Sequence, residues 1–264
     1  MPKENFFAGI DIGSRTCKGV IINDNREVVA SDLRKTGLDS KNIAEISFKK
    51  MIESSAVKKD KVKYVVSTGY GRANADFAQK EITEISCHGY GAFNLFSDIR
   101  GIIDIGGQDS KVIRLNDTGK VIDFSMNDKC AAGTGKFMET MAVTLNLTID
   151  EISKIGLNAE KAVDISNVCT VFAESEVINY IHKGESKKSI IAGLYKSVAD
   201  KVMKQVNKVN PSPQIVMSGG VAKNEGVVQM LEKQLESNLK IPESPQLVGA
   251  FGAALLAFKN YNNN

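Results

Sequence analysis

The sequence predicts an α/β protein built as two lobes of similar plan, and three observations lead to this prediction. A short apolar run that ends in Asp-x-Gly occurs twice, as FFAGIDIG at residues 6–13 and as IIDIGG at residues 102–107. Two further β-branched segments, at residues 64–71 and 214–221, also end in glycine. Stretches of helical period lie between these segments. Strands followed by helices in each half favour two α/β lobes with mixed sheets.

The first element of each lobe is a predicted β-hairpin. Residues 6–13 are followed by a polar segment and then by a second apolar run at residues 19–22, and the same order recurs at residues 102–115. An offset of 93 residues aligns Asp11 with Asp104, Gly13 with Gly106 and Lys18 with Lys111. The repeat is long and occurs only twice, so it indicates a duplication and not a solenoid.

Helices are expected in the segments between these strands. Their ranges are 41–54, 73–81, 135–145, 174–182, 189–208 and 224–236. A strongly apolar helix, rich in Gly and Ala, is expected over residues 249–258, where small residues would permit close packing. We expect lobe I to comprise residues 1–97 together with 246–264, and lobe II to comprise residues 98–245.

Composition indicates an ordinary globular protein. The chain has 264 residues, 42% of them hydrophobic, and a formal net charge of +3. This near balance gives no support to nucleic acid or an acidic membrane as a partner. No apolar run reaches the ~18 residues of a membrane-spanning helix. Because the start, Met-Pro-Lys-Glu-Asn, lacks the apolar stretch of a signal peptide, we expect a soluble cytoplasmic protein.

The two Asp-Gly turns are candidate phosphate-binding elements. Glycine turns present backbone N–H groups to anions, and Asp11 and Asp104, embedded in apolar strands, each need a partner such as hydrated Mg²⁺. Lys18 would neutralise phosphate oxygens, and Gln108 would orient an attacking water. One such turn is equally typical of a plain hairpin, but two copies in register, with a further glycine pair at residues 218–220, favour a nucleotide clamp. No GxxxxGK[ST] P-loop is present.

Five longer motifs carry a resemblance to a known family. They are VSTGYGR (66–72), IIDIGGQDSK (102–111), MNDKCAAGTGKF (126–137), CTVFAESEV (169–177) and PQLVGAFGAAL (245–255). The chain resembles the sugar kinase, Hsp70 and actin superfamily, through residues 9–18, 103–111 and 216–224. Within it, the chain is most similar to the BadF/BadG/BcrA/BcrD group, and there to the activators of 2-hydroxyacyl-CoA dehydratases.

The resemblance implies two duplicated RNase H-like lobes with ATP in the cleft between them. It places Mg²⁺ on Asp11 and Asp104, with Gln108 beside the attacking water. The implied nucleotide-binding residues are Gly13, Ser14, Arg15, Thr16, Cys17, Lys18, Gly106, Gly107, Gly133, Gly135, Lys136, Gly219, Gly220, Val221, Asn224 and Gln246. Relatives usually carry small residues where this chain has Arg15 and Cys17, although the backbone role of the loop is unaffected.

The four cysteines, Cys17, Cys87, Cys130 and Cys169, form no CxxC pair. Taken alone, such scattered cysteines are typical of buried small hydrophobic residues. Cys130 and Cys169, however, are expected just before or at helix N-termini, where a thiolate is stabilised. A [4Fe–4S] cluster takes four thiolates, which two chains of a homodimer would supply. The resemblance supports this, because the family's cluster-binding cysteines fall on Cys130 and Cys169.

The sequence therefore predicts an ATPase coupled to low-potential electron transfer. The implied acceptor is a 2-hydroxyacyl-CoA dehydratase or a related double-cubane or benzoyl-CoA-type reductase, and the implied donor is ferredoxin or flavodoxin. Two alternatives remain at this stage. One is a small-molecule kinase that uses the same clamp, with Asp104 as its base. The other is a nucleotide-dependent interaction protein without redox chemistry.

Overall fold

The computed structural model describes residues 5–263. The chain divides into two compact units. Unit 1 consists of Met1–Asp98, Asn116–Val121 and Gln246–Asn264, and unit 2 consists of Ile99–Leu115 and Ile122–Pro245. The first four residues of the start Met-Pro-Lys-Glu-Asn, on which the prediction about a signal peptide rests, lie outside the described residues.

Unit 1 contains a mixed five-stranded sheet of order β3-β2-β1-β4-β5. Its strands are β1 (Phe6–Ile12), β2 (Thr16–Asn23), β3 (Val28–Lys35), β4 (Val62–Thr68) and β5 (Lys80–Glu81). Its helices are α1 (Ser40–Glu53), α2 (Glu84–Leu95) and α8 (Val248–Asn262), with short 3₁₀ turns η1 (Lys59–Lys61) and η2 (Arg72–Asn74). β1 is antiparallel to β2 and parallel to β4.

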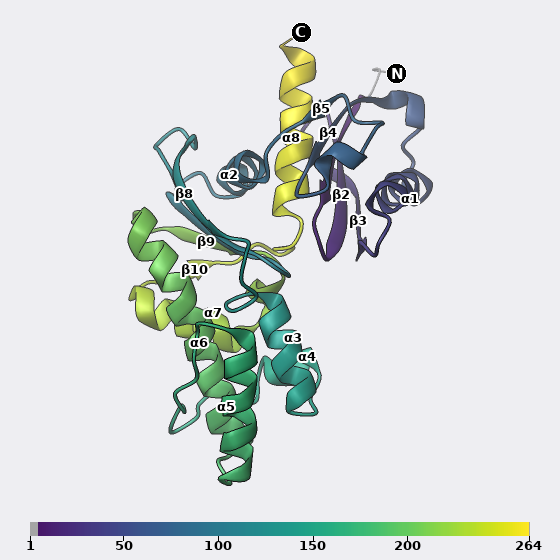
Figure 1. The fold of residues 1–264 in the computed structure, drawn as a ribbon. Helices are drawn as coiled ribbons and strands as arrows, with labels where there is room; N and C mark the ends of the chain where they lie inside the picture. The colour runs from purple at the N-terminus through teal and green to yellow at the C-terminus, as the bar shows by residue number, and fades with distance from the viewer. Residues whose placement is uncertain (1–4, 264) are drawn as a thin grey trace. The chain divides into compact units, whose positions relative to one another are not determined.

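The alternation of side chains along β1 gives this sheet two buried faces. Ile10 and Ile12 pack with α1 in one apolar cluster, whereas Phe7 packs with α2 and α8 in another. Figure 1 shows α8 running beside α2 and the sheet. Gly9 makes this close approach feasible, because a β-carbon there would lie 2.1 Å from the backbone oxygen of Ala250.

Unit 2 contains a second five-stranded sheet, of order β8-β7-β6-β9-β10. Its strands are β6 (Gly101–Ile105), β7 (Ser110–Leu115), β8 (Val121–Asn127), β9 (Ile215–Ser218) and β10 (Leu239–Lys240). Its helices are α3 (Gly135–Thr144), α4 (Ile149–Ile152), α5 (Thr170–His182), α6 (Lys187–Val209) and α7 (Glu225–Leu235), with a 3₁₀ turn η3 (Gly220–Lys223). One apolar cluster joins the sheet to these helices.

The two sheets match strand for strand, which confirms the predicted duplication. In unit 1, Asp11 is the register partner of Lys18 on one side and of Thr68 on the other. In unit 2, Asp104 is the register partner of Lys111 and of Ser218 in the same way. The central strand, the antiparallel hairpin partner and the parallel crossover partner are therefore equivalent in both units.

Two local predictions were wrong. The helix expected at residues 73–81 is instead the turn η2, a loop and β5. The helix of this region is α2, which begins at Glu84 because the Thr83 hydroxyl accepts a hydrogen bond from the backbone N–H of Ser86, 3.3 Å away. The second error concerns Cys130, which lies five residues before α3 begins and not at its N-terminus.

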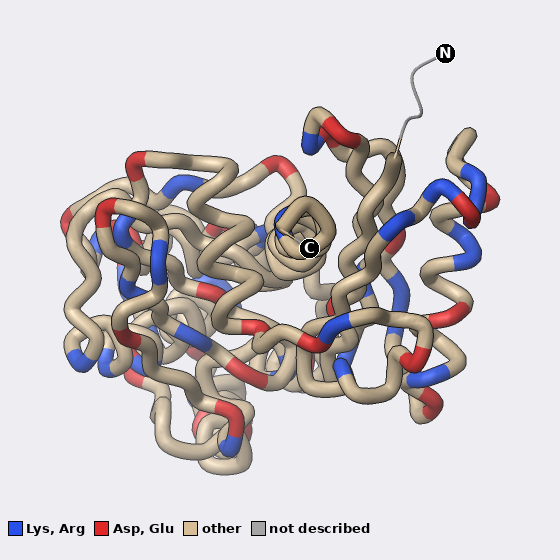
Figure 2. Tube along the Cα trace, turned by 90° about the horizontal axis from the view of Figure 1, so that it is seen from above, with Lys and Arg blue, Asp and Glu red and all other residues tan. Residues whose placement is uncertain are grey.

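Charge is distributed evenly along the trace. Figure 2 shows Lys and Arg interspersed with Asp and Glu over the elements of both units. Among residues 5–263, no helix combines the length and the apolar character that crossing a bilayer requires.

Candidate functional site

In unit 1, the predicted carboxylate Asp11 is held at the end of β1. It is 5% exposed, and the ammonium of Lys18 on β2 lies 3.1 Å from its Oδ2. The following turn is closed by the backbone N–H of Gly13, which donates to the backbone oxygen of Thr16 at 3.1 Å. The Thr36 hydroxyl donates to the backbone oxygen of Gly13. The ion pair of Asp11 and Lys18 therefore lies next to a glycine turn that two hydrogen bonds hold in place.

The loop after β4 packs directly on this carboxylate. Gly69 has φ of +87°, and a β-carbon there would lie 2.5 Å from Asp11 Oδ1. A β-carbon at Gly249 would lie 3.2 Å from Asp11 Oδ2 and 2.8 Å from Nε2 of His88, a residue only 6% exposed. Both glycines leave room around Asp11. Sequence reasoning missed His88, which has no local signal apart from being one of two histidines.

In unit 2, the equivalent carboxylate Asp104 is more completely enclosed. The Ser218 hydroxyl donates to its Oδ1 at 2.7 Å, and Lys111 lies 3.2 Å from its Oδ2. Lys111 is 2% exposed and also lies 2.9 Å from Asp109 Oδ2. A buried ammonium is thus balanced by two carboxylates. Lys111 was aligned with Lys18 by the repeat but was not predicted as a site residue, and neither were Asp109 and Ser218.

The second glycine turn is fixed to the first turn of α3. The backbone N–H of Gly135 donates to the oxygen of Gly106 at 2.9 Å, and that of Lys136 donates to the oxygen of Gly107 at 2.8 Å. Helix N-termini leave such N–H groups without intrahelical partners. The turn therefore satisfies two of them. Four predicted nucleotide-binding residues are brought together, and the predicted Gln108 lies exposed in the same turn.

The predicted adenosine motif follows β9 at the same end of the sheet. Gly219 has φ of +88°, and a β-carbon there would lie 2.2 Å from the oxygen of Ile105, the residue before Gly106. Gly220 and Val221 form η3, and the Asn224 side chain caps α7 by accepting from the N–H of Val227 at 3.0 Å. Gly219 therefore lies against the second glycine turn.

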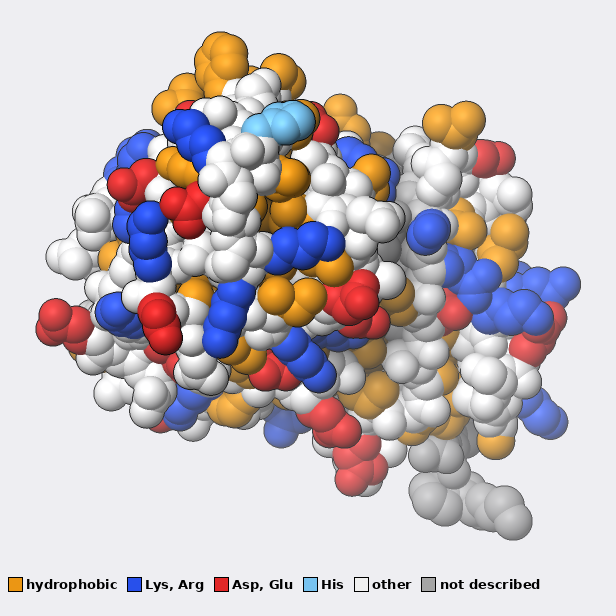
Figure 3. All heavy atoms as spheres, turned by 90° about the horizontal axis from the view of Figure 1, so that it is seen from below, with side chains coloured by type: hydrophobic (Ala, Val, Ile, Leu, Met, Phe, Trp, Pro, Cys, Tyr) orange, Lys and Arg blue, Asp and Glu red, His pale blue; other side chains and the backbone are white. Residues whose placement is uncertain are grey.

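The predicted cluster ligands lie on neighbouring loops of unit 2. Cys169 is the N-cap residue of α5. The Cys130 thiol donates to the backbone oxygen of Val168, the residue directly before Cys169, at 3.4 Å. Both cysteines are partly exposed. The apolar side chains of Val168, Val171 and Phe172 beside them are 62–65% exposed. Figure 3 shows exposed apolar side chains, in orange, interspersed with charged ones.

The other two cysteines have a different environment. Burial raises the pKa of the Cys17 thiol to about 12, and the negative charge of Asp11 adds to this rise. Burial likewise raises the pKa of Cys87 to about 12. Both thiols are fully buried and protonated at neutral pH. Only a thiolate binds metal well. The structure therefore separates two accessible thiols from two inaccessible ones.

The remaining predicted residues lie close to these groups in the sequence. Ser14 and Arg15 form the turn between β1 and β2, and Thr16 begins β2. Gln246 lies in the turn before α8. In the loop before α3, Gly133 has φ of +82°, and a β-carbon there would lie 2.7 Å from Lys201 Cγ on α6. Within residues 5–263, no group of three or more His, Cys, Asp or Glu residues is arranged to hold a metal ion.

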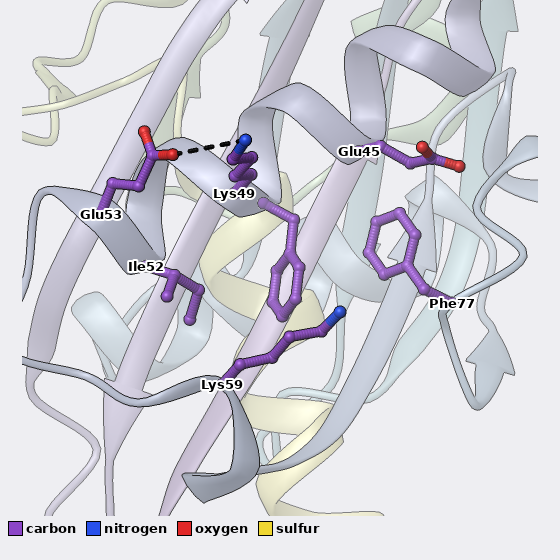
Figure 4. A pocket seen from close by; sticks show the side chains of 7 residues that line it. Glu45, Lys49, Ile52, Glu53, Lys59 and Phe77 are labelled. Carbon is purple, nitrogen blue, oxygen red and sulfur yellow. Dashed lines mark ion pairs between the residues drawn. The ribbon is translucent and has the colours of Figure 1, made fainter.

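A separate cavity of about 520 Å³ in unit 1 includes none of the predicted site residues. Figure 4 shows Phe77 among the side chains that line it. The Phe48 ring, which also lines the cavity, is stacked on Phe77 with the ring centroids 5.1 Å apart. Lys49 and Glu53 form an ion pair of 3.7 Å at the rim. The other lining residues are Glu45, Ile52 and Lys59.

Comparison with known proteins identifies relatives of similar length. The chain is 45% identical over 251 residues to the activator of lactoyl-CoA dehydratase from Anaerotignum propionicum, covering 95% of this chain and 96% of the relative. The activator of 2-hydroxyisocaproyl-CoA dehydratase from Clostridium difficile, solved with bound ADPNP, superimposes with a TM-score of 0.90. It is 40% identical, and the match covers 98% of this chain and 96% of that one.

More distant structures bear on the fold alone. A ROK family glucokinase from Streptomyces griseus, in complex with glucose and AMPPNP, superimposes with a TM-score of 0.58 at 11% identity, covering 97% of this chain and all of that one. The expected sugar-kinase-like fold is thereby confirmed. The model of the BadF/BadG/BcrA/BcrD ATPase family matches residues 8–257. With a match over nearly the whole chain and relatives above 40% identity, this protein belongs to the BadF/BadG/BcrA/BcrD ATPase family.

Proposed function

We propose that this ATPase is the activator of a 2-hydroxyacyl-CoA dehydratase or of a related double-cubane or benzoyl-CoA-type reductase. In this role it couples ATP hydrolysis to the delivery of low-potential electrons. The observation that carries the proposal is the short link in unit 2 between the glycine turn at Gly106 and Gly107 and the segment that carries Cys130. The relatives named as dehydratase activators support the choice of acceptor.

For the nucleotide, we assign the carboxylates of Asp11 and Asp104 to Mg²⁺ and the ammonium of Lys18 to the phosphates. Asp11 and Asp104 each engage a lysine, but a carboxylate oxygen accepts more than one hydrogen bond, so each can also accept from the water shell of Mg²⁺. Lys18 neutralises phosphate charge, and exposed Gln108 orients the attacking water. The remaining nucleotide contacts are assigned to the glycine turns and their neighbours, namely Gly13, Ser14, Arg15, Thr16, Cys17, Gly106, Gly107, Gly133, Gly135, Lys136, Gly219, Gly220, Val221, Asn224 and Gln246.

For the redox group, Cys130 and Cys169 fit half of a [4Fe–4S] ligand set. Both thiols are partly exposed, and they lie on neighbouring loops next to an exposed apolar surface. A second copy of the chain would supply the other two thiolates across a twofold axis. When bound, the cluster supplies a one-electron carrier. Ferredoxin or flavodoxin is the proposed donor.

The proposal is tested by iron content and oligomeric state after anaerobic purification. We expect about two irons per chain, because one four-iron cluster is shared by two chains, together with a homodimer and a spectrum that bleaches in air. Cys130→Ser and Cys169→Ser should each lose the iron, since serine is a poor ligand for this metal. Cys87→Ser is the matched control and should keep it. An iron-bearing stable monomer, or an iron-free active chain as in a small-molecule kinase, would contradict the proposal.

A further inference from the structure

A short series of contacts joins the two cysteine loops to the rest of unit 2. The phosphate turn at Gly106 and Gly107 is hydrogen-bonded to the first two residues of α3 at 2.9 and 2.8 Å. The N-cap Thr134 makes no side-chain cap, and its hydroxyl donates instead to the oxygen of Ala131. A displacement of the turn is therefore passed to the start of α3.

The Cys130 loop is tied to the same end of α3. The side-chain amide of Asn127, the last residue of β8, donates to the oxygen of Cys130 at 2.9 Å and to that of Ala132 at 3.3 Å. Thr134 closes the loop through its backbone N–H, which donates to the oxygen of Ala131 at 3.1 Å. Cys130 is thus linked to the phosphate turn through a short series of hydrogen bonds.

Within residues 5–263, Cys169 is joined to the turn by no such series of hydrogen bonds. The loop before it is held by α5 and α6: Glu176 Oε2 accepts from the N–H of Ser166 at 2.7 Å, and the Ser197 hydroxyl donates to the oxygen of Ser166 at 3.1 Å. The contact from the Cys130 thiol to Val168 is a weak thiol hydrogen bond. The position of Cys169, the N-cap residue of α5, therefore depends on where α5 lies, with α6 as a second support of the preceding loop.

A polar contact joins α3 to α5. The Thr144 hydroxyl, on the last residue of α3, lies 2.9 Å from Glu174 Oε1 and 3.1 Å from the backbone oxygen of Thr140, so its one hydrogen is shared between two acceptors, of which Glu174 is the nearer and is charged. Figure 1 shows the two helices side by side. Their other shared contacts, such as those of Met141, Ala173 and Val177, are apolar and non-directional. A directional, charge-assisted hydrogen bond fixes how the helices slide past each other, which apolar packing does not.

We propose that Thr144 and Glu174 are positioning residues that make α3 and α5 move as one body, so that a nucleotide at the Gly106–Gly107 turn shifts Cys169 together with Cys130. Without the bond, the turn still acts on Cys130 through Asn127 and Thr134, but no longer on Cys169. The inference rests on the proposed phosphate-binding role of that turn. It does not depend on the presence of iron.

The test uses the cluster-free full-length chain and the two accessible thiols as reporters. Alkylation rates of Cys130 and Cys169 are measured by peptide mass spectrometry with and without Mg²⁺ and ADPNP. We expect the nucleotide to change both rates by about tenfold, a usual size for coupling between sites. In Thr144→Val and in Glu174→Ala, the response of Cys130 should persist, and that of Cys169 should fall below about twofold.

Three matched variants separate this role from simple stabilisation. Glu174→Gln retains the acceptor oxygen, and Thr144→Ser retains the donor, so both should keep the Cys169 response. Thr140→Val removes a hydroxyl one turn earlier on α3, which donates to the oxygen of Lys136 within the same helix at 3.0 Å, and it should also keep the response. The proposal is overturned if Cys169 responds normally in Thr144→Val, if Thr140→Val is equally defective, or if neither thiol of the unmodified chain responds to the nucleotide. The iron count tests the proposed function independently of all three.

Discussion

At the scale of single residues, the exposed Gln108 and the enclosed Asp104 predict different kinetic defects. Gln108 lies in the second glycine turn and has no structural hydrogen bond in the described residues, so its replacement leaves the turn intact. A group that orients the attacking water matters mainly in the transition state. Gln108→Ala should therefore lower kcat for ATP hydrolysis by about a hundredfold while changing nucleotide affinity by less than about threefold.

Asp104→Asn provides the contrast for that measurement. It removes one of the two carboxylates that balance buried Lys111, and it also removes the proposed metal partner. Nucleotide affinity and kcat should fall together, as measured by ATP titration and steady-state hydrolysis. If Gln108→Ala weakens ATP binding as much as Asp104→Asn does, Gln108 does not act on the water.

The buried thiols predict a loss of stability in alkaline solution. Burial raises the pKa of Cys17 and of Cys87 from 9.0 to about 12. Above pH 9 the unfolded chain releases these protons and the folded chain keeps them, so stability is complete below pH 9 and falls as pH rises toward 12. Each thiol should contribute a loss of about 1 kcal/mol by pH 10.

Urea unfolding at pH 8 and pH 10 measures this effect. In the Cys87→Ala variant, the difference between the two pH values should be smaller by about 1 kcal/mol. All other titrating groups are common to both proteins and cancel in the comparison. An unchanged difference would mean that Cys87 ionises in the folded chain.

At the scale of elements, the crossing of α2 and α8 depends on glycine. A β-carbon at Gly252 would lie 1.9 Å from the backbone oxygen of Cys87 and 2.8 Å from the backbone N of Gly91. Alanine would gain about 1 kcal/mol of helix propensity. That gain is smaller than the cost of separating two packed backbones, so Gly252→Ala should destabilise unit 1 by about 2 kcal/mol. Thermal unfolding of the variant shows whether its stability falls or rises. A raised Tm would mean that the helices separate easily.

The same crossing explains why α2 was not predicted from the sequence. The segment EISCHGYGAFNL contains Gly89 and Gly91, which lower helix propensity. These glycines are required by the packing of α2 against α8, because a β-carbon at Gly91 would lie 2.4 Å from the oxygen of Val248. The central hairpins were predictable because buried, β-branched strands run into glycine turns. The edge strand β3 was not, since its half-exposed residues lack a clear apolar alternation. β8 was also missed, although Ile122, Phe124 and Met126 alternate with polar residues and its signal was present in the sequence.

The candidate site was predictable in part for a similar reason. Repetition drew attention to Asp11 and Asp104, since an identical motif at a fixed offset is visible in one dimension. The contact between Thr144 and Glu174 joins residues 30 positions apart and leaves no such trace. The second bond of Lys111, to Asp109, is likewise a matter of side-chain geometry.

At the scale of the whole molecule, the duplication sets two equivalent positions in different environments. Ser218 donates to Asp104, whereas Thr68, at the matching place beside Asp11, is fully buried and its hydroxyl has no hydrogen-bond partner among residues 5–263. Removing a satisfied buried donor costs about 1–3 kcal/mol, but replacing an unsatisfied hydroxyl by a methyl group is nearly neutral. Ser218→Ala should therefore destabilise the protein, and Thr68→Val should leave its stability within about 1 kcal/mol of the starting value.

Chemical denaturation of the two variants compares the units directly. The measurement is the free energy of unfolding of each unit, with Ser218→Ala affecting unit 2 and Thr68→Val affecting unit 1. Equal losses in both variants would mean that Thr68 is bonded as Ser218 is, and that the two units have kept the same polar contacts since the duplication.

The order of the elements along the chain has a consequence for biosynthesis. α8 follows all of unit 2 in the sequence, yet its residues Ala250, Ala253 and Ala254 complete an apolar cluster with Phe7 and Val66 of unit 1. During translation, unit 2 has every segment of its core before the ribosome reaches α8. Unit 1 is synthesised first, but one face of its sheet stays uncovered until α8 has been made. We expect a chaperone to bind this exposed apolar face in the nascent chain.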